Sequence, residues 1–204
     1  MVRYGYRRKR ADETAGRNEM DNRTIETLFP QFLEISDESL RTVSEDAMLA
    51  AMKKGGWDEE NIRLCPVTLN WKNCDVTWIE HVRDVTDMCR MEFDHLKKYY
   101  ERHGVPFSRD IVVAGALLHD IGKLTEFVCR DRKAVHGDDY QLMRHPLSGA
   151  LIADRCGVPT ELVHLIAVHS FEGDKSYQTP ESEFVRTVDI FTFQQSVKGL
   201  EKIG

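Results

Sequence analysis

Long apolar runs are missing from this sequence. No apolar stretch approaches the roughly 20 residues that cross a bilayer, and none follows the basic start of the chain. We therefore expect neither a transmembrane helix nor a secretory signal. Cysteines are few, odd in number and scattered, and none forms a CxxC pair. This argues against a thiolate zinc site and a disulfide framework, and it favours a cytoplasmic protein.

Positive charge is also in deficit. The 204 residues include 28 Lys and Arg against 34 Asp and Glu, which gives a formal charge of −6. This balance argues against general affinity for nucleic acid. The length suits one sizeable hydrophobic core, so a single domain is expected. The eight histidines are the unusual number in the composition.

Alternating strand patterns, internal repeats and low-complexity tracts are absent too, while helical spacing recurs along the chain. A first helical stretch around 25–32 contains Pro30. Further helices are predicted at 44–54, 76–103, 108–118, 146–156, 159–169 and 181–198. Residues 111–118 are apolar on every side, which is typical of a central buried helix. These patterns predict an all-α fold.

The chain divides by composition into three parts. Residues 1–22 contain the basic run 7–10 and few aliphatic residues, which predicts a mobile basic tail; an arm that binds nucleic acid is the alternative. Residues 23–74 are predicted to form an N-terminal helical extension, and 75–204 the main helical domain.

Histidine and aspartate recur on or beside the apolar stripes of the predicted helices. These positions are His81, His119, Asp120, His145, His169 and Asp189. One inward histidine is more often a core residue with its hydrogen bonds satisfied than a metal ligand. Four histidines and two aspartates in a small domain need partners, because buried charge is costly. Imidazole and carboxylate suit Fe, Mn, Ni, Co or Zn, and two ions sharing a bridging Asp would use all six groups.

The same residues, in this order, resemble the HD-domain metal-dependent phosphohydrolase superfamily. Residues 115–123, GALLHDIGK, are similar to its HD-x-G-K signature, and 145–152 to the HPxxG segment of its HDIG branch. Residues 186–189 resemble its final ligand segment. The resemblance covers roughly 76–198 and implies an HD-domain helical bundle with a dinuclear site. It places His81, His119, Asp120 and Asp189 around one metal ion and Asp120, His145 and His169 around the other.

This resemblance implies hydrolysis of a small, nucleotide-like phosphoester. Two divalent transition-metal ions, Fe or Mn before Ni, Co or Zn, would activate a water and neutralise phosphate charge. Asp120 and Lys123 are the catalytic candidates, with Lys123 holding a substrate oxygen, and Arg144 is a further substrate-binding candidate. The expected partner is a small phosphorylated molecule, and a homo-oligomer is left open.

Two other functions fit the same six residues. HD-domain proteins that resemble myo-inositol oxygenase share this ligand set, hold a mixed-valent di-iron pair and cleave a C–C or C–P bond with dioxygen. A regulatory module with an inactive site is the third hypothesis. In each case the loops 124–144 and 170–181 are expected to shape the pocket.

Overall fold

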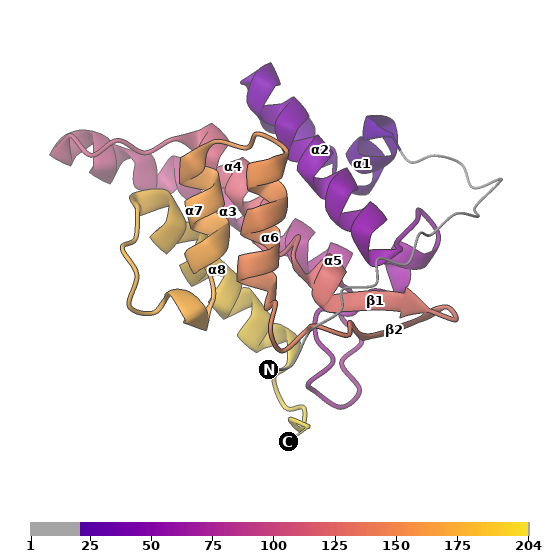
Figure 1. Ribbon diagram of the computed structural model, residues 1–204. Helices are drawn as coiled ribbons and strands as arrows, with labels where there is room; N and C mark the ends of the chain where they lie inside the picture. The colour runs from indigo at the N-terminus through magenta and orange to yellow at the C-terminus, as the bar shows by residue number, and fades with distance from the viewer. Residues whose placement is uncertain (1–20, 204) are drawn as a thin grey trace, which may run out of the picture.

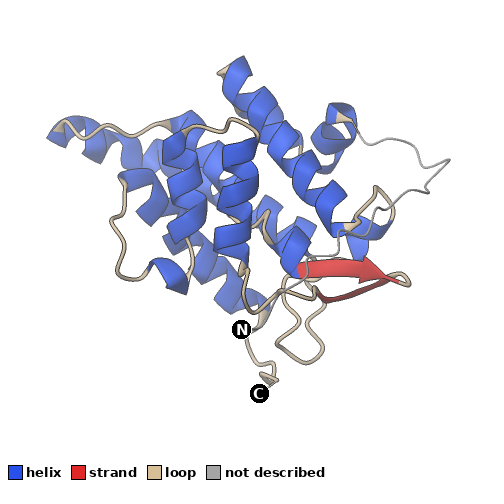
Figure 2. Cartoon of the chain, in the orientation of Figure 1, coloured by secondary structure: helices blue, strands red, loops and turns tan. Residues whose placement is uncertain are grey.

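The computed structural model describes residues 21–203, so the basic run of the predicted tail lies outside the described residues. Helices make up most of the chain, which confirms the all-α class (Figure 2). The α-helices (α), 3-10 helices (η) and strands (β) follow in the order α1 (Asn22–Leu28), η1 (Pro30–Glu34), α2 (Glu38–Gly55), η2 (Asn61–Leu64), α3 (Trp78–His103), α4 (Arg109–Leu118), α5 (Lys123–Glu126), β1 (Phe127–Arg130), β2 (Lys133–His136), α6 (His145–Arg155), α7 (Thr160–Val168), η3 (Phe171–Gly173) and α8 (Pro180–Ser196). Among these residues, no helix combines the length and the apolar character that crossing a membrane requires.

Capping residues explain where the helices begin and end. The side chain of Thr77 accepts from the backbone N–H of Glu80, whose carboxylate accepts in return, and this capping box starts α3. Gly104, with φ 65°, ends that helix in the left-handed region. Helix α2 begins at Glu38, earlier than the predicted start at residue 44. Asp37 caps this earlier start by accepting from two backbone N–H groups, and the prediction did not use this capping signal.

A short hairpin lies within residues 124–144, a segment for which no strand was predicted. Strands β1 and β2 pair antiparallel, with Phe127 opposite His136 and Arg130 opposite Lys133. At the tip, Asp131 and Arg132 have φ of 50° and 59°, the geometry of a tight two-residue turn without glycine. Four-residue strands with a polar, glycine-free turn carry too little alternation to be read from sequence.

One continuous hydrophobic core joins the N-terminal helices to the rest of the chain. Helix α4, the predicted central helix, is buried from Val112 to Leu118 and contacts α2, η1, α3, α7 and α8. Helices α6 and α7 lie side by side, and α2 packs against α6 and α5 next to the β1–β2 hairpin (Figure 1). Gly115 lets α4 approach α7 closely, because a Cβ there would lie 2.5 Å from the Leu165 side chain.

Candidate metal centre

The structure brings all six predicted ligands to one place. They come from five helices: His81 from α3, His119 and Asp120 from the end of α4, His145 from the start of α6, His169 from the end of α7 and Asp189 from α8. The four histidines and Asp120 are buried, and Asp189 is partly exposed. The predicted inward orientation of these side chains therefore agrees with their burial.

His119 and His169 are fixed by the ends of their own helices. Each follows the last residue of its helix, where backbone carbonyls lack the next N–H donor. The Nδ1 of His119 donates to the oxygen of Ala116 at 2.7 Å, and that of His169 to the oxygen of Ile166 at 2.8 Å. When either imidazole is neutral, Nε2 is therefore the atom that carries the lone pair.

Gly122 brings the end of α4 against the start of α6. A Cβ at this position would lie 1.9 Å from the backbone oxygen of His145, so only glycine fits. This close approach sets His145 beside Asp120, and the glycine of the HD-x-G-K segment thus has a packing role. Helix α6 begins at His145, with Arg144 as its N-cap, one residue earlier than the predicted start at residue 146.

The two oxygens of Asp120 face different histidines. Oδ1 lies 3.5 Å from Nε2 of His145 and 3.5 Å from Nε2 of His169. Oδ2 lies 3.6 Å from Nε2 of His81 and 3.5 Å from Nε2 of His119. Asp120 therefore lies between two pairs of imidazoles, with one oxygen directed to each pair.

Asp189 joins the pair formed by His81 and His119. Its Oδ1 lies 3.0 Å from Nε2 of His81 and 3.6 Å from Nε2 of His119. Two clusters of three result, one of His81, His119 and Asp189 and the other of Asp120, His145 and His169, each with its donor atoms within 4.8 Å of one another. The donor set is imidazole and carboxylate, which suits divalent transition metals.

Bound divalent ions explain the arrangement of these donor atoms better than hydrogen bonds among the six side chains do. The Nε2 of His119 is buried and has no hydrogen-bond partner among the described residues. This nitrogen faces carboxylate oxygens, an arrangement that is repulsive unless a cation or a proton lies between. Burial lowers the pKa of His119, but Asp120 and Asp189 outweigh it and raise that pKa, which shows that the site favours a positive charge here. Two ligands that share an ion, each about 2.1 Å from it, are separated by at most about 4.2 Å, so nitrogen-to-oxygen distances of 3.0–3.6 Å are compatible with shared ions.

Lys123 contacts Asp120 directly. The Lys123 Nζ lies 2.7 Å from Oδ2 of Asp120 and 5.6 Å from the centre of the Phe193 ring. Burial alone lowers the pKa of Lys123, but the carboxylates of Asp120 and Asp189 outweigh it and raise that pKa above its usual value. Lys123 is therefore a permanent cation at the base of the pocket.

Burial and charge together set the protonation of the ligands. Burial raises the pKa of Asp120, but Lys123 and His119 outweigh it and hold the pKa well below its usual value. Asp189 behaves alike, because His119 and His81 overcome its burial and lower its pKa. Burial dominates at His81 and lowers its pKa, which favours the neutral imidazole that metals bind.

Glu126 is a residue of this site that the sequence analysis missed. Its Oε2 accepts from the backbone N–H of His145 at 2.7 Å and from the His145 Nδ1 at 3.1 Å, and Oε1 pairs with Arg144. Glu126 thereby leaves Nε2 of His145 as the lone-pair atom that faces Asp120. The available signal was its position one helical turn after Lys123, at the start of a segment predicted to be a loop.

Arg144 lies at the pocket, as predicted for a substrate-binding residue, but its charge is already shared. It pairs with Glu126, and its Nε donates to Glu172 at 3.2 Å. Its guanidinium also lies 5.9 Å from the centre of the Phe171 ring. These contacts hold Arg144 in one orientation beside His145.

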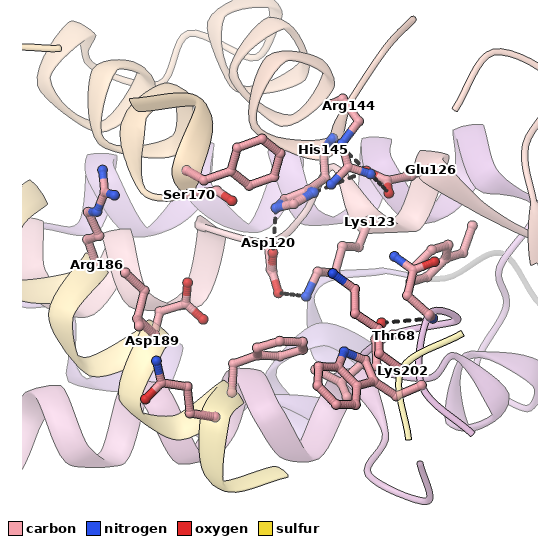
Figure 3. Close-up of a pocket in the computed structure, with 18 of the residues that line it drawn as sticks. Thr68, Asp120, Lys123, Glu126, Arg144, His145, Ser170, Arg186, Asp189 and Lys202 are labelled. Carbon is pink, nitrogen blue, oxygen red and sulfur yellow. Dashed lines mark hydrogen bonds and ion pairs between the residues drawn. The ribbon is translucent and has the colours of Figure 1, made fainter. Parts of the chain in front are cut away.

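The candidate site opens into a cavity of about 480 Å³. Its floor includes Asp120, Lys123, Glu126, His145 and Asp189 (Figure 3). Both loops that were expected to shape the pocket contribute side chains, including Phe127 and Phe171. Two further segments were not predicted to do so: residues 67–71, before α3, and Lys202, after α8.

Comparison with known proteins agrees with the resemblance seen in the sequence. Residues 78–193 match the HD domain family. The dihydroneopterin 2',3'-cyclic phosphate phosphodiesterase of Methanocaldococcus jannaschii is 32% identical over 124 residues, which are 60% of this chain and 47% of that protein. The chain thus spans about half the length of this curated relative. No solved structure matches the chain.

Proposed function

This chain belongs to the HD-domain family, and on that premise we propose that it is a metal-dependent phosphohydrolase that cleaves a small phosphoester. The observation that supports this proposal most directly is the position of Asp120, which directs one oxygen toward each of two pairs of histidines. The relative acts on a cyclic phosphodiester, so 2',3'-cyclic phosphates of pterins and nucleosides are the first substrates to test.

The proposal includes two divalent ions. One would be held by His81, His119, Asp120 and Asp189, and the other by Asp120, His145 and His169. When bound, such ions lower the pKa of a coordinated water and neutralise charge on phosphate oxygens. Fe or Mn suits this mixture of imidazole and carboxylate ligands, with Ni, Co or Zn also compatible.

The residues around the ligands hold them and the phosphate in place. Lys123 keeps Asp120 ionised at 2.7 Å and places positive charge at the base of the pocket, where a phosphate oxygen can approach. Glu126 fixes the ring of His145 through Nδ1. Arg144, held by two carboxylates, presents N–H groups beside His145. Phe127 and Phe193 line the same cavity and give part of it an apolar surface.

We also propose that residues 23–74 are an extension of the 75–204 HD domain rather than a separate unit. The ring of Phe29 lies 5.5 Å from that of Trp78, and both side chains are fully buried. Arg83 of α3 donates to the backbone oxygen of Leu28 at 2.7 Å. Separating the two parts would expose this shared core, so neither part is expected to fold alone.

The decisive experiment measures metal content and phosphoester hydrolysis in one preparation. Protein purified without chelators is expected to contain about two transition-metal ions per chain. When it is loaded with Mn or Fe(II), the protein should hydrolyse 2',3'-cyclic nucleotides to monophosphates in the absence of dioxygen. The Asp120→Asn variant should not. No hydrolysis with any phosphoester, together with dioxygen uptake and a mixed-valent iron signal, would instead establish the oxygenase. One ion per chain in the active protein would contradict the dinuclear part of the proposal.

A further inference from the structure

One side of the pocket lies outside the part of the chain that matches the HD domain. The family match covers residues 78–193, whereas Val67, Thr68, Asn70, Trp71 and Lys202 also line the cavity. We refer to residues 67–71 together with Lys202 as the outer wall. Figure 3 shows Thr68 and Lys202 beyond Lys123, on the side away from Arg144 and His145.

The outer wall is tied to the core at its base. Val67 donates to the backbone oxygen of Val76 at 3.0 Å, and Trp78 donates to that of Cys65 at 2.8 Å. These bonds close residues 65–78 into a loop that stands at the start of α3. The side chain of Val67 is fully buried, so this end of the loop is fixed by packing as well.

The tip of the loop pairs with the last described residues of the chain. Two backbone hydrogen bonds join them, from Lys72 N–H to the Glu201 oxygen at 2.9 Å and from Ile203 N–H to the Asn70 oxygen at 2.8 Å. Trp71 and Lys202 form the antiparallel bridge between these bonds. Two segments far apart in sequence thus place an indole and an ammonium group on the same wall.

Aromatic side chains are more frequent in this pocket than a phosphate requires. Trp71, Phe127, Phe171 and Phe193 all line the cavity. Phosphate oxygens are recognised by cations and N–H donors, whereas aromatic faces stack on planar rings. The indole of Trp71 is half-buried, so one part of it is open to a ligand. The composition of the wall therefore favours a substrate with a planar ring.

Lys202 differs from the other cations of the pocket. Three lining cations already contact carboxylates: Lys123 with Asp120, Arg144 with Glu126 and Glu172, and Arg186 with Asp174. Within residues 21–203, no carboxylate lies in ion-pair range of Lys202. Its ammonium group is free to donate to an acceptor oxygen or nitrogen on a ligand.

We propose that Trp71 and Lys202 bind the planar heteroaromatic ring of the substrate, Trp71 by stacking and Lys202 by donating to a ring acceptor. The phosphoester then lies over the floor of the pocket. The substrate class is thus a phosphoester of an oxopurine- or pterin-like alcohol. This inference rests on the proposed function for the position of the phosphoester, but ring binding is measurable without turnover.

Intrinsic fluorescence tests the stacking directly. Trp57 and Trp78 are 2% and 0% exposed, so a ligand in the cavity can quench Trp71 while leaving the other two indoles shielded. We expect guanosine 3'-monophosphate to quench the fluorescence of the Mn-loaded protein, and ribose 5-phosphate not to. In Trp71→Phe the quenching should disappear. Quenching that is unchanged in Trp71→Phe would overturn the proposal.

Affinity measured by calorimetry tests both residues. Trp71→Ala should weaken guanosine 3'-monophosphate binding about tenfold or more, and Lys202→Ala about threefold to tenfold. Neither change should alter ribose 5-phosphate binding. Tyr177→Ala and Lys198→Ala are matched controls, because both side chains are exposed and neither lines the cavity.

The outcomes separate this inference from the proposed function. Ring binding that depends on Trp71, in a protein that hydrolyses no phosphoester, supports the inference and removes the hydrolase. Hydrolysis of 2',3'-cyclic nucleotides with unchanged KM in Trp71→Ala keeps the hydrolase and overturns the inference. Equal losses for 2',3'-cyclic GMP and for glycerol 1,2-cyclic phosphate, which has no ring, would also overturn it.

Discussion

The floor and the outer wall of the pocket are built in opposite ways. On the floor, helices of the common core bury His81, His119 and Asp120 and orient them through hydrogen bonds and packing. On the wall, Trp71 and Lys202 lie on irregular segments joined mainly by backbone pairing. A change on the floor disturbs the core, whereas Trp71 and Lys202 are only half-buried and exposed, respectively, so a change at either of them leaves the core packing intact. The floor is therefore suited to determine the type of reaction, and the wall the choice of substrate.

Buried carboxylates show a similar contrast between the site and the N-terminal extension. Asp120 on the floor is held ionised because Lys123 and the histidines outweigh its burial. Glu45 on α2 is 3% exposed, and burial raises its pKa above the usual 4.5. Its Oε2 accepts from Asn22 at 3.0 Å, but its Oε1 has no hydrogen-bond partner among residues 21–203. Buried charge is balanced at the site and only partly balanced in the extension.

The largest effect is expected from Asp120→Asn. The amide cannot provide a negatively charged oxygen to each pair of histidines, and it leaves Lys123 without its carboxylate. Hydrolysis of cyclic nucleotides should fall by about 10³-fold or more, roughly 4 kcal/mol of transition-state stabilisation, and elemental analysis should show loss of both ions. Asp154→Asn, an exposed change on α6, is the matched control. If the variant kept normal turnover and both ions, Asp120 would be neither a metal ligand nor a catalytic residue.

A smaller effect is expected from Glu126→Gln. The amide keeps the shape but loses the charge that orients His145, so affinity for the ion held by Asp120, His145 and His169 should fall about 10- to 100-fold. Competition with a fluorescent chelator measures this affinity for each ion. Glu172→Gln is the matched control, because Glu172 contacts Arg144 and is not a hydrogen-bond partner of His145. Equal losses in the two variants would assign the effect to Arg144 instead.

The wall is tested separately by Ile203→Pro. Proline removes the N–H that donates to Asn70, whereas Ile203→Ala keeps it. Loss of this bond should weaken guanosine 3'-monophosphate binding about twofold to tenfold and leave hydrolysis of glycerol 1,2-cyclic phosphate unchanged. A matching loss with the ring-free substrate would show that wall and floor are not independent.

The smallest effect concerns Glu45. Since its pKa in the folded protein is raised, its stabilising contribution is complete below pH 4.5 and is lost as the pH rises through the folded value. Glu45→Gln should therefore raise the melting temperature by about 2 °C at pH 7 and by nothing at pH 4. Glu38→Gln, exposed on the same helix, is the control. A variant no more stable than the native chain at pH 7 would mean that Glu45 is adequately solvated.

Local patterns predicted most of the helices but not the supports of the site. The long helix predicted at 76–103 was confirmed as α3, because its apolar spacing and its glycine stop are local features. The β1–β2 hairpin was missed, because its strands are short and its turn lacks glycine. Glu126 was missed for a related reason, since the one-turn helix that carries it ends in that hairpin.

By itself, the sequence determined that the chain is all-α and that four histidines and two aspartates belong to inward helix faces. A helical period of 3.6 residues places each side chain relative to its neighbours, and no distant contact is needed for that inference. Only the tertiary structure decided which oxygen of Asp120 faces which histidines, and that Trp71 and Lys202 share a wall. These relations depend on the packing of distant segments, which no local period encodes.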